Sequence, residues 1–159
     1  MGFPTPFVRS VRNADSEPTT YLEDRDLIVL TQTCDIPKPA QQTILLAQVV
    51  SYDALASKGG TDMKGSKYRR KLVENIIQPF FLLRPFNEPA LPWSLVCFRD
   101  LHVAPKDEVQ LFTTTAGLRL RLRSPYREHL AQSYARFMMR VGLPSTTDDF
   151  EKYEPGSSE

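Results

Sequence analysis

The chain has 159 residues, of which 41% are apolar and 25% charged, and this composition predicts one globular domain with a real core. Its net charge of +1 excludes a uniformly basic protein. The chain contains no run of about 18 apolar residues, so no membrane span is expected. Two cysteines and two histidines lie far apart, so no disulfide framework, metal site or cofactor motif is expected. The N-terminus lacks the apolar core of a signal peptide, which predicts a cytoplasmic protein.

Three segments are expected along the chain. Residues 1–20 contain three prolines and predict a loosely attached N-terminal arm. Residues 21–144 predict a single, β-barrel-like globular domain. Residues 145–159 carry five acidic residues and one lysine, and they predict an acidic, disordered tail.

Apolar runs and alternation predict the elements of the globular domain. DLIVLTQTC and TILLAQVVSY read as two central strands joined by the turn PKPAQQ, in which Pro37 and Pro39 should end the pairing. A short helix is expected in KYRRKLVENIIQ, followed by strands in FFLLRPF, WSLVCFRDLHV, VQLF and LRLRLR. The last helix is expected in PYREHLAQSYARFMMRVG, with Ser124 as its N-cap and Gly142 as its C-terminal cap.

These elements predict a mainly β, α+β fold. Several short strands and one packed C-terminal helix favour a small, curved antiparallel sheet, which we expect to form a compact, half-open barrel.

The alternation in LRLRLR, residues 118–123, predicts a strand with its leucines facing inward and its arginines facing outward. Arginines at alternate positions stand about 6.8 Å apart, which is close to the phosphate spacing of an extended nucleic acid. The resulting basic face, extended by Arg127, is the candidate site for a partner. The alternative is that the charges only protect an edge strand from aggregation. The arginines concerned are Arg119, Arg121 and Arg123.

The segments RDLIVLTQTCDI and TILLAQVVSYDAL resemble the core hairpin of the PemK/MazF toxin family, over about residues 24–57. The resemblance implies an SH3-like barrel that can dimerise. It also implies a pair of residues that cleave single-stranded RNA, an arginine opening the first strand and a hydroxyl closing the second, which fall on Arg25 and Ser51. The ending SPYREHLAQSYARFMMRVGLP also resembles small bacterial proteins with a QTCD strand, a resemblance that implies no activity.

The end of the first strand, QTCD, holds the remaining candidates. Gln32 and Thr33 could line a binding groove. Cys34 could be a reactive thiol if folding brought His102 and Asp100 beside it, which would make a cysteine-dependent hydrolase. The alternative for Cys34 is a thiol that fills the core at a strand end.

The sequence favours a binding module over an enzyme. Asp26 follows Arg25 where the toxins usually have proline, and an acid there would repel an RNA phosphate. We therefore expect a bacterial accessory or defence-associated protein that holds a protein partner or RNA on its basic face. It needs no metal and can form a homodimer. An endoribonuclease toxin and a cysteine-dependent hydrolase remain the alternatives.

Overall fold

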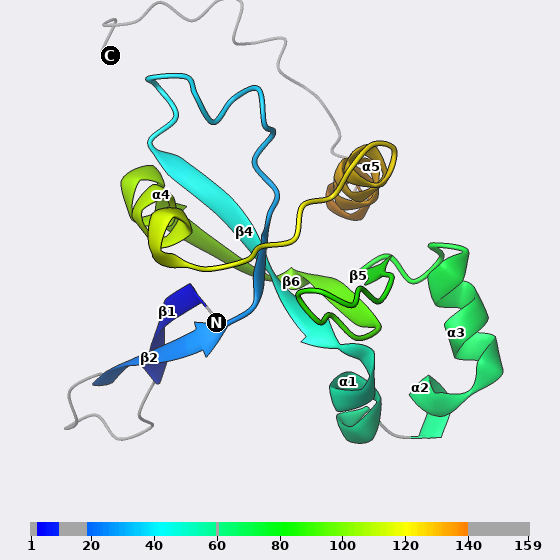
Figure 1. Ribbon diagram of the computed structural model, residues 1–159. Helices are drawn as coiled ribbons and strands as arrows, with labels where there is room; N and C mark the ends of the chain where they lie inside the picture. Colours follow the sequence, from blue (N-terminus) through cyan, green and yellow to red (C-terminus); the bar gives the residue numbers. More distant parts are fainter. Residues whose placement is uncertain (1–2, 10–18, 60, 140–159) are drawn as a thin grey trace, which may run out of the picture.

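A computed structural model of the protein describes residues 3–9, 19–59 and 61–139. Its centre is a four-stranded antiparallel sheet with the strand order β3-β4-β6-β5. The sheet curls into a half-barrel with helices packed on it (Figure 1), so the predicted α+β fold with a small curved sheet is confirmed. The strands of this sheet are β3 (Leu27–Val29), β4 (Thr43–Ser51), β5 (Phe80–Leu83) and β6 (Ser94–Pro105).

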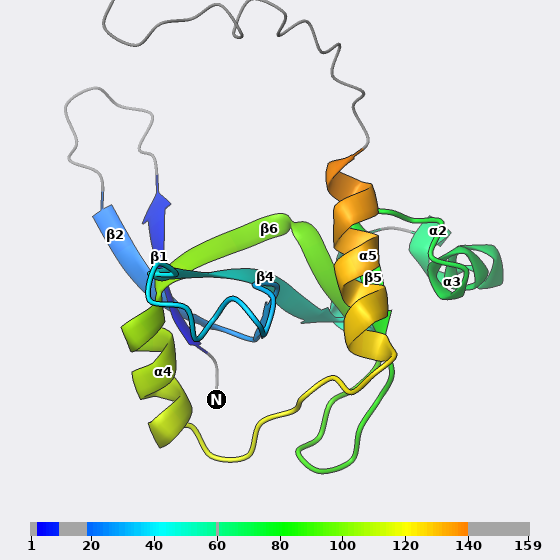
Figure 2. The ribbon, with the colours of Figure 1, turned by 90° about the horizontal axis from the view of Figure 1, so that it is seen from above.

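Five helices connect or cover these strands within the described residues. Three short helices link β4 to β5, and two longer ones follow β6 and lie at opposite ends of the sheet (Figure 2). No described helix combines the length and apolar character needed to cross a bilayer. The helices are α1 (Tyr52–Lys58), α2 (Thr61–Lys64), α3 (Ser66–Val73), α4 (Lys106–Thr115) and α5 (Tyr126–Met138).

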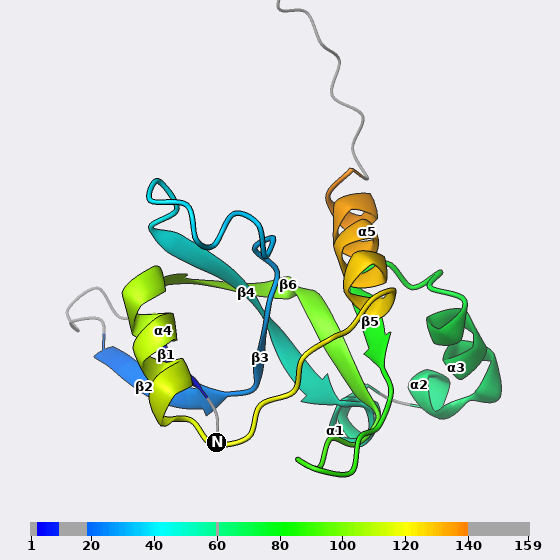
Figure 3. The same cartoon turned by 45° about the horizontal axis from the view of Figure 1, so that its top comes forward.

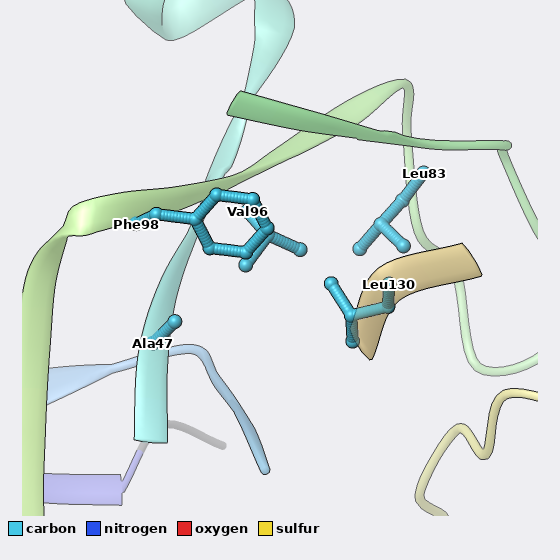
Figure 4. Close-up of a cluster of buried hydrophobic side chains, with 5 residues drawn as sticks. All are labelled: Ala47, Leu83, Val96, Phe98 and Leu130. Atoms are coloured by element: carbon cyan, nitrogen blue, oxygen red, sulfur yellow. The ribbon is translucent and has the colours of Figure 1, made fainter. Parts of the chain in front are cut away.

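The sheet has an apolar core on each face, because successive side chains of a strand point to opposite sides. The first core holds Ala47 and the α5 residue Leu130 (Figure 4), whereas the second holds Leu46 and is covered by Val109 of α4. Both faces of β4 are therefore buried, which explains why its sequence is continuously apolar rather than alternating. The first core consists of Ala47, Leu83, Val96, Phe98 and Leu130.

The predicted hairpin of the first two strands is confirmed, although its first strand is shorter than expected. Leu27 pairs with Gln48 and Val29 with Leu46. The chain then leaves the ladder, where the Thr31 hydroxyl accepts a hydrogen bond from the Leu45 N–H at 2.8 Å. Residues 31–40 form successive turns, so the pairing stops well before Pro37.

The N-terminal segment forms a two-stranded ribbon beside the main sheet. Strand β1 (Phe3–Arg9) pairs antiparallel with β2 (Thr19–Arg25), and Phe3 lies opposite Arg25. The Phe3 ring meets Phe112 of α4 edge-on, with 5.0 Å between the ring centroids. Phe3 thus docks on the second core, while the acidic segment 145–159 lies outside the described residues.

Two predicted strands are wrong. Residues 109–112 lie inside α4, where Asp107 and Glu108 occupy the favourable first turn of the helix. A four-residue run such as VQLF is compatible with the side-chain period of a strand and with that of a helix, and in this structure it is helical. Residues 118–123 form an open coil, because this stretch spans the distance from α4 to α5 instead of following a strand edge (Figure 3).

The last helix is confirmed, with a different beginning. It starts at Tyr126 with Pro125 in the N-cap position, so Ser124 does not cap it. The predicted cap at Gly142 lies outside the described residues.

A buried hydrogen bond ties the end of α3 to α5. Asn75 takes a positive φ of 54° and donates through Nδ2 to the Ser133 hydroxyl at 2.6 Å, and Ser133 is buried. Replacing Ser133 with alanine should lower the free energy of unfolding by about 1 kcal/mol, because the Asn75 amide loses its acceptor. Urea unfolding measures the change. The exposed helical Ser57→Ala is the control, and an equal loss in both variants would contradict the prediction.

Candidate partner-binding site

The connection between α4 and α5 carries the candidate binding surface. It begins where the Ala116 N–H donates to the Phe112 carbonyl at the end of α4. It ends where the Arg123 carbonyl accepts from the Arg127 N–H at the start of α5. Between these points only Leu122 packs against the first core. The coil is therefore held at both ends and at one leucine, and its other side chains face solvent.

Three arginines on this coil, Arg119, Arg121 and Arg123, are all exposed, and we call them the arginine row. None of them forms an ion pair or a side-chain hydrogen bond with any described residue. Their alternate spacing and exposure agree with the sequence prediction, although the backbone that carries them is a coil. A guanidinium presents a planar fork of N–H donors that fits a carboxylate or a phosphate in a bidentate manner.

Arg127, the predicted extension of the row, differs from it. Its guanidinium donates to the neighbouring Glu128 carboxylate at 2.8 Å. This hydrogen bond, ahead of the other contributions, lowers the pKa of Glu128 below its usual value. Arg127 is thus partly neutralised within the chain, whereas Arg119, Arg121 and Arg123 have no ion pair with a described acid.

Leucines that were expected to face inward lie beside the row on the surface. Leu118 is 76% exposed and Leu120 is 43% exposed. Because the coil has no neighbouring strand, these side chains have no sheet face to cover. The surface therefore combines free cations with apolar side chains. The sequence alone did not indicate this, since the alternation was assigned to a strand.

Arg25 is held within the protein. It donates to Glu23 at 2.7 Å and lies 3.3 Å from an oxygen of Asp100, and only 15% of its side chain is exposed. On the same carboxylate, the other oxygen lies 3.1 Å from His102 Nε2. The His102 Nε2 atom is buried and forms no hydrogen bond to a described residue. Its contact with Asp100 is an ion pair only when His102 is protonated. The partnership of Arg25 with Asp100 spans 75 residues and has no local signal in the sequence.

Ser51 is the N-cap of α1. Its hydroxyl accepts a hydrogen bond from the Ala54 N–H at 3.1 Å, a standard use of serine at this position. No hydrogen bond joins Ser51 to Arg25 among the described residues. The two positions that the toxin resemblance pairs therefore serve separate local contacts in this structure.

The QTCD segment lies in the turns after β3. Gln32 and Thr33 are exposed, and Cys34 is an exposed free thiol whose sulfur lies 3.6 Å from Gln32 Oε1. The interpretation of Cys34 as a core residue is wrong, because β3 ends at Val29 and the thiol sits in a surface turn. No hydrogen bond or ion pair links Cys34 with Asp100 or His102 in the described chain.

The neighbouring Asp35 fixes this turn. Its carboxylate accepts from Lys38 Nζ at 2.6 Å, and this hydrogen bond raises the pKa of Lys38 above its usual value. In the described part of the chain no group of three or more His, Cys, Asp or Glu is placed to hold a metal ion. The turn therefore offers hydrogen-bonding side chains but no assembled catalytic group.

Comparison of the chain with protein-family models, with curated proteins and with solved structures finds no match. The function must therefore be argued from the surface itself.

Proposed function

We propose that the protein is a binding module that holds an acidic protein partner on the arginine row. The observation that carries the proposal is the set of three exposed arginines at alternate positions with no acidic partner among the described residues. An unbalanced cluster of this kind attracts closely spaced negative charges and steers their approach. Backbone hydrogen bonds join the coil to both long helices, and Leu122 packs on the first core.

Two features favour a protein partner over RNA. Leu118 and Leu120 are exposed beside the arginines, and an apolar side chain of a protein partner would cover them. Base stacking on aromatic rings supports most binding of single-stranded RNA, and residues 117–125 contain no aromatic residue.

The endoribonuclease alternative gains less support from the geometry. Arg25 already faces two carboxylates, so a phosphate would have to compete with Glu23 and Asp100. The cysteine-dependent alternative lacks a base in contact with Cys34. Cys34 and Cys97 are both free thiols, and Cys34 is exposed, which fits a reducing compartment. We therefore also propose that the protein acts in a bacterial cytoplasm, in an accessory role.

The test compares two charge reversals of equal size. Arg119→Glu with Arg121→Glu removes two members of the row. Lys67→Glu with Lys71→Glu changes two exposed cations of α3 that make no side-chain hydrogen bond to a described residue. The probe is a fluorescein-labelled peptide of alternating glutamate and leucine, followed by fluorescence anisotropy. A single-stranded RNA of similar charge is measured in parallel.

We expect the row variant to bind the peptide about tenfold more weakly, since each exposed contact contributes on the order of 0.5–1 kcal/mol. The α3 variant should stay within about twofold of the wild type. An equal loss in both variants would show general attraction to a positive protein and would refute a specific surface. Tighter, row-dependent binding of the RNA would replace the protein partner with a nucleic acid.

A further inference from the structure

We infer that residues 148–154 of this chain, DDFEKYE, dock on the arginine row and compete with its partner. The docking itself follows from the charges and the chain length, whereas the competition rests on the function proposed above. The segment that would occupy the arginine row belongs to the same chain, so the contact is intramolecular and the effective concentration of the segment is high.

Charge is the first argument. Residues 145–159 contain five acidic residues and one lysine, a net charge of −4, and four of the five acids fall within 148–154. The arginine row offers three guanidinium groups with no ion pair to a described residue. Three other cations are already paired with a nearby carboxylate: Arg127 with Glu128, Arg70 with Glu74 and Lys38 with Asp35. The row therefore leaves three guanidinium groups open to carboxylates, and the competing cationic surface is α3, where Lys67 and Lys71 form no ion pair with a described residue.

Apolar complementarity is the second argument. The acids of 148–154 are interrupted by Phe150 and Tyr153, and the exposed Leu118 and Leu120 directly precede Arg119 and Arg121. A segment with both features can place carboxylates on guanidinium groups and rings on leucines at the same time. The basic helix α3 also has exposed apolar neighbours, Val73 and Ile76, but they follow its cations along the chain instead of alternating with them.

Chain length permits the contact. Helix α5 has 13 residues and is about 20 Å long, so its C-terminal end lies roughly that far from the row at its N-terminal end. The ten residues from Met138 to Asp148 span at most about 33–36 Å when extended. The acidic segment therefore reaches back along α5 to Arg123 without strain, and its remaining residues extend toward Arg119.

The experiment uses the full chain and solution NMR of its backbone amides. Asp148→Asn with Asp149→Asn weakens the acidic segment, and Asp53→Asn with Asp62→Asn removes the same charge from exposed positions of α1 and α2. We expect the tail variant to shift the amide signals of residues 117–123, and high salt to shift the wild-type signals in the same direction. The control variant should leave these signals unchanged. Unchanged signals at 117–123 in the tail variant, or shifts confined to 64–71, would overturn the inference.

The glutamate-leucine peptide separates docking from competition. If the acidic segment competes, the tail variant should bind the peptide about fivefold more tightly than the wild type, while the control variant does not change. Shifts at 117–123 without any row-dependent binding of the peptide would support docking and would refute the proposed binding function. Row-dependent binding of the peptide without those shifts would support the proposed function and would refute docking.

Discussion

Replacing Phe98 with alanine is expected to lower the free energy of unfolding by about 3–5 kcal/mol, the largest effect of any single substitution considered for this protein. Phe98 is 1% exposed and lies in the first core, where its ring meets Tyr134 at 5.4 Å and Phe137 at 5.8 Å between centroids. These two rings belong to α5, so the cavity would loosen the helix from the sheet as well as remove apolar contacts. Urea unfolding followed by circular dichroism measures the loss.

Phe86 provides the matched control for this substitution. It has the same side chain, but it is 55% exposed and lies between β5 and β6. Phe86→Ala removes less than half of the buried area and should lower the free energy of unfolding by no more than about 2 kcal/mol. Similar losses in the two variants would mean that Phe98 is not the centre of the core.

The sequence predicts the elements that are buried on one or both faces. Strands β4 and β6 are long, apolar runs, and each forms where the pattern places it. Helix α5 follows from apolar residues at spacings of three and four, of which Leu130, Tyr134 and Phe137 pack on the first core. In these elements the side-chain period agrees with the burial that the fold requires, which is why the local sequence pattern is sufficient to predict them.

The sequence misleads where local pattern and tertiary path conflict. LRLRLR has the period of a strand, but the chain must cross from α4 to α5, so the segment has no edge to pair with and two of its leucines remain on the surface. The exposure of its arginines was still predictable, because a cation without a partner stays in water whatever the backbone does. The exposure of Leu118 and Leu120, which belong to the same surface, was not predictable.

The polar cluster of Arg25, Asp100 and His102 was equally hidden, because the sequence suggested Ser51 as the partner of Arg25 and Cys34 as the partner of Asp100 and His102. It forms because the ladder between β4 and β6 is irregular: Ala47 pairs with Leu101, whereas the next residue, Gln48, pairs with Cys97. The extra residues of β6 in this bulge include Asp100. A bulge of this kind re-aims side chains, and no feature of the sequence marks its position.

Asp100→Asn is the second substitution with a large expected effect. The change keeps the shape of the side chain but removes the charge that faces both Arg25 and His102. Arg25 is only 15% exposed, so its guanidinium would be left with Glu23 as its remaining carboxylate among the described residues. Removing one member of a fully buried pair costs about 3–5 kcal/mol. Because Asp100 is 37% exposed, solvent screens part of the interaction and we expect a loss of about 2 kcal/mol.

Two controls show whether this loss comes from the cluster. Asp62→Asn changes an exposed acid on α2 and should stay within about 0.5 kcal/mol of the wild type. Glu23→Gln removes the other carboxylate facing Arg25, but Glu23 is 61% exposed, so it should cost less than Asp100→Asn. If Asp100→Asn were as stable as Asp62→Asn, Arg25 would not depend on Asp100. The assignment of Asp100 as the structural partner of Arg25 would then be wrong.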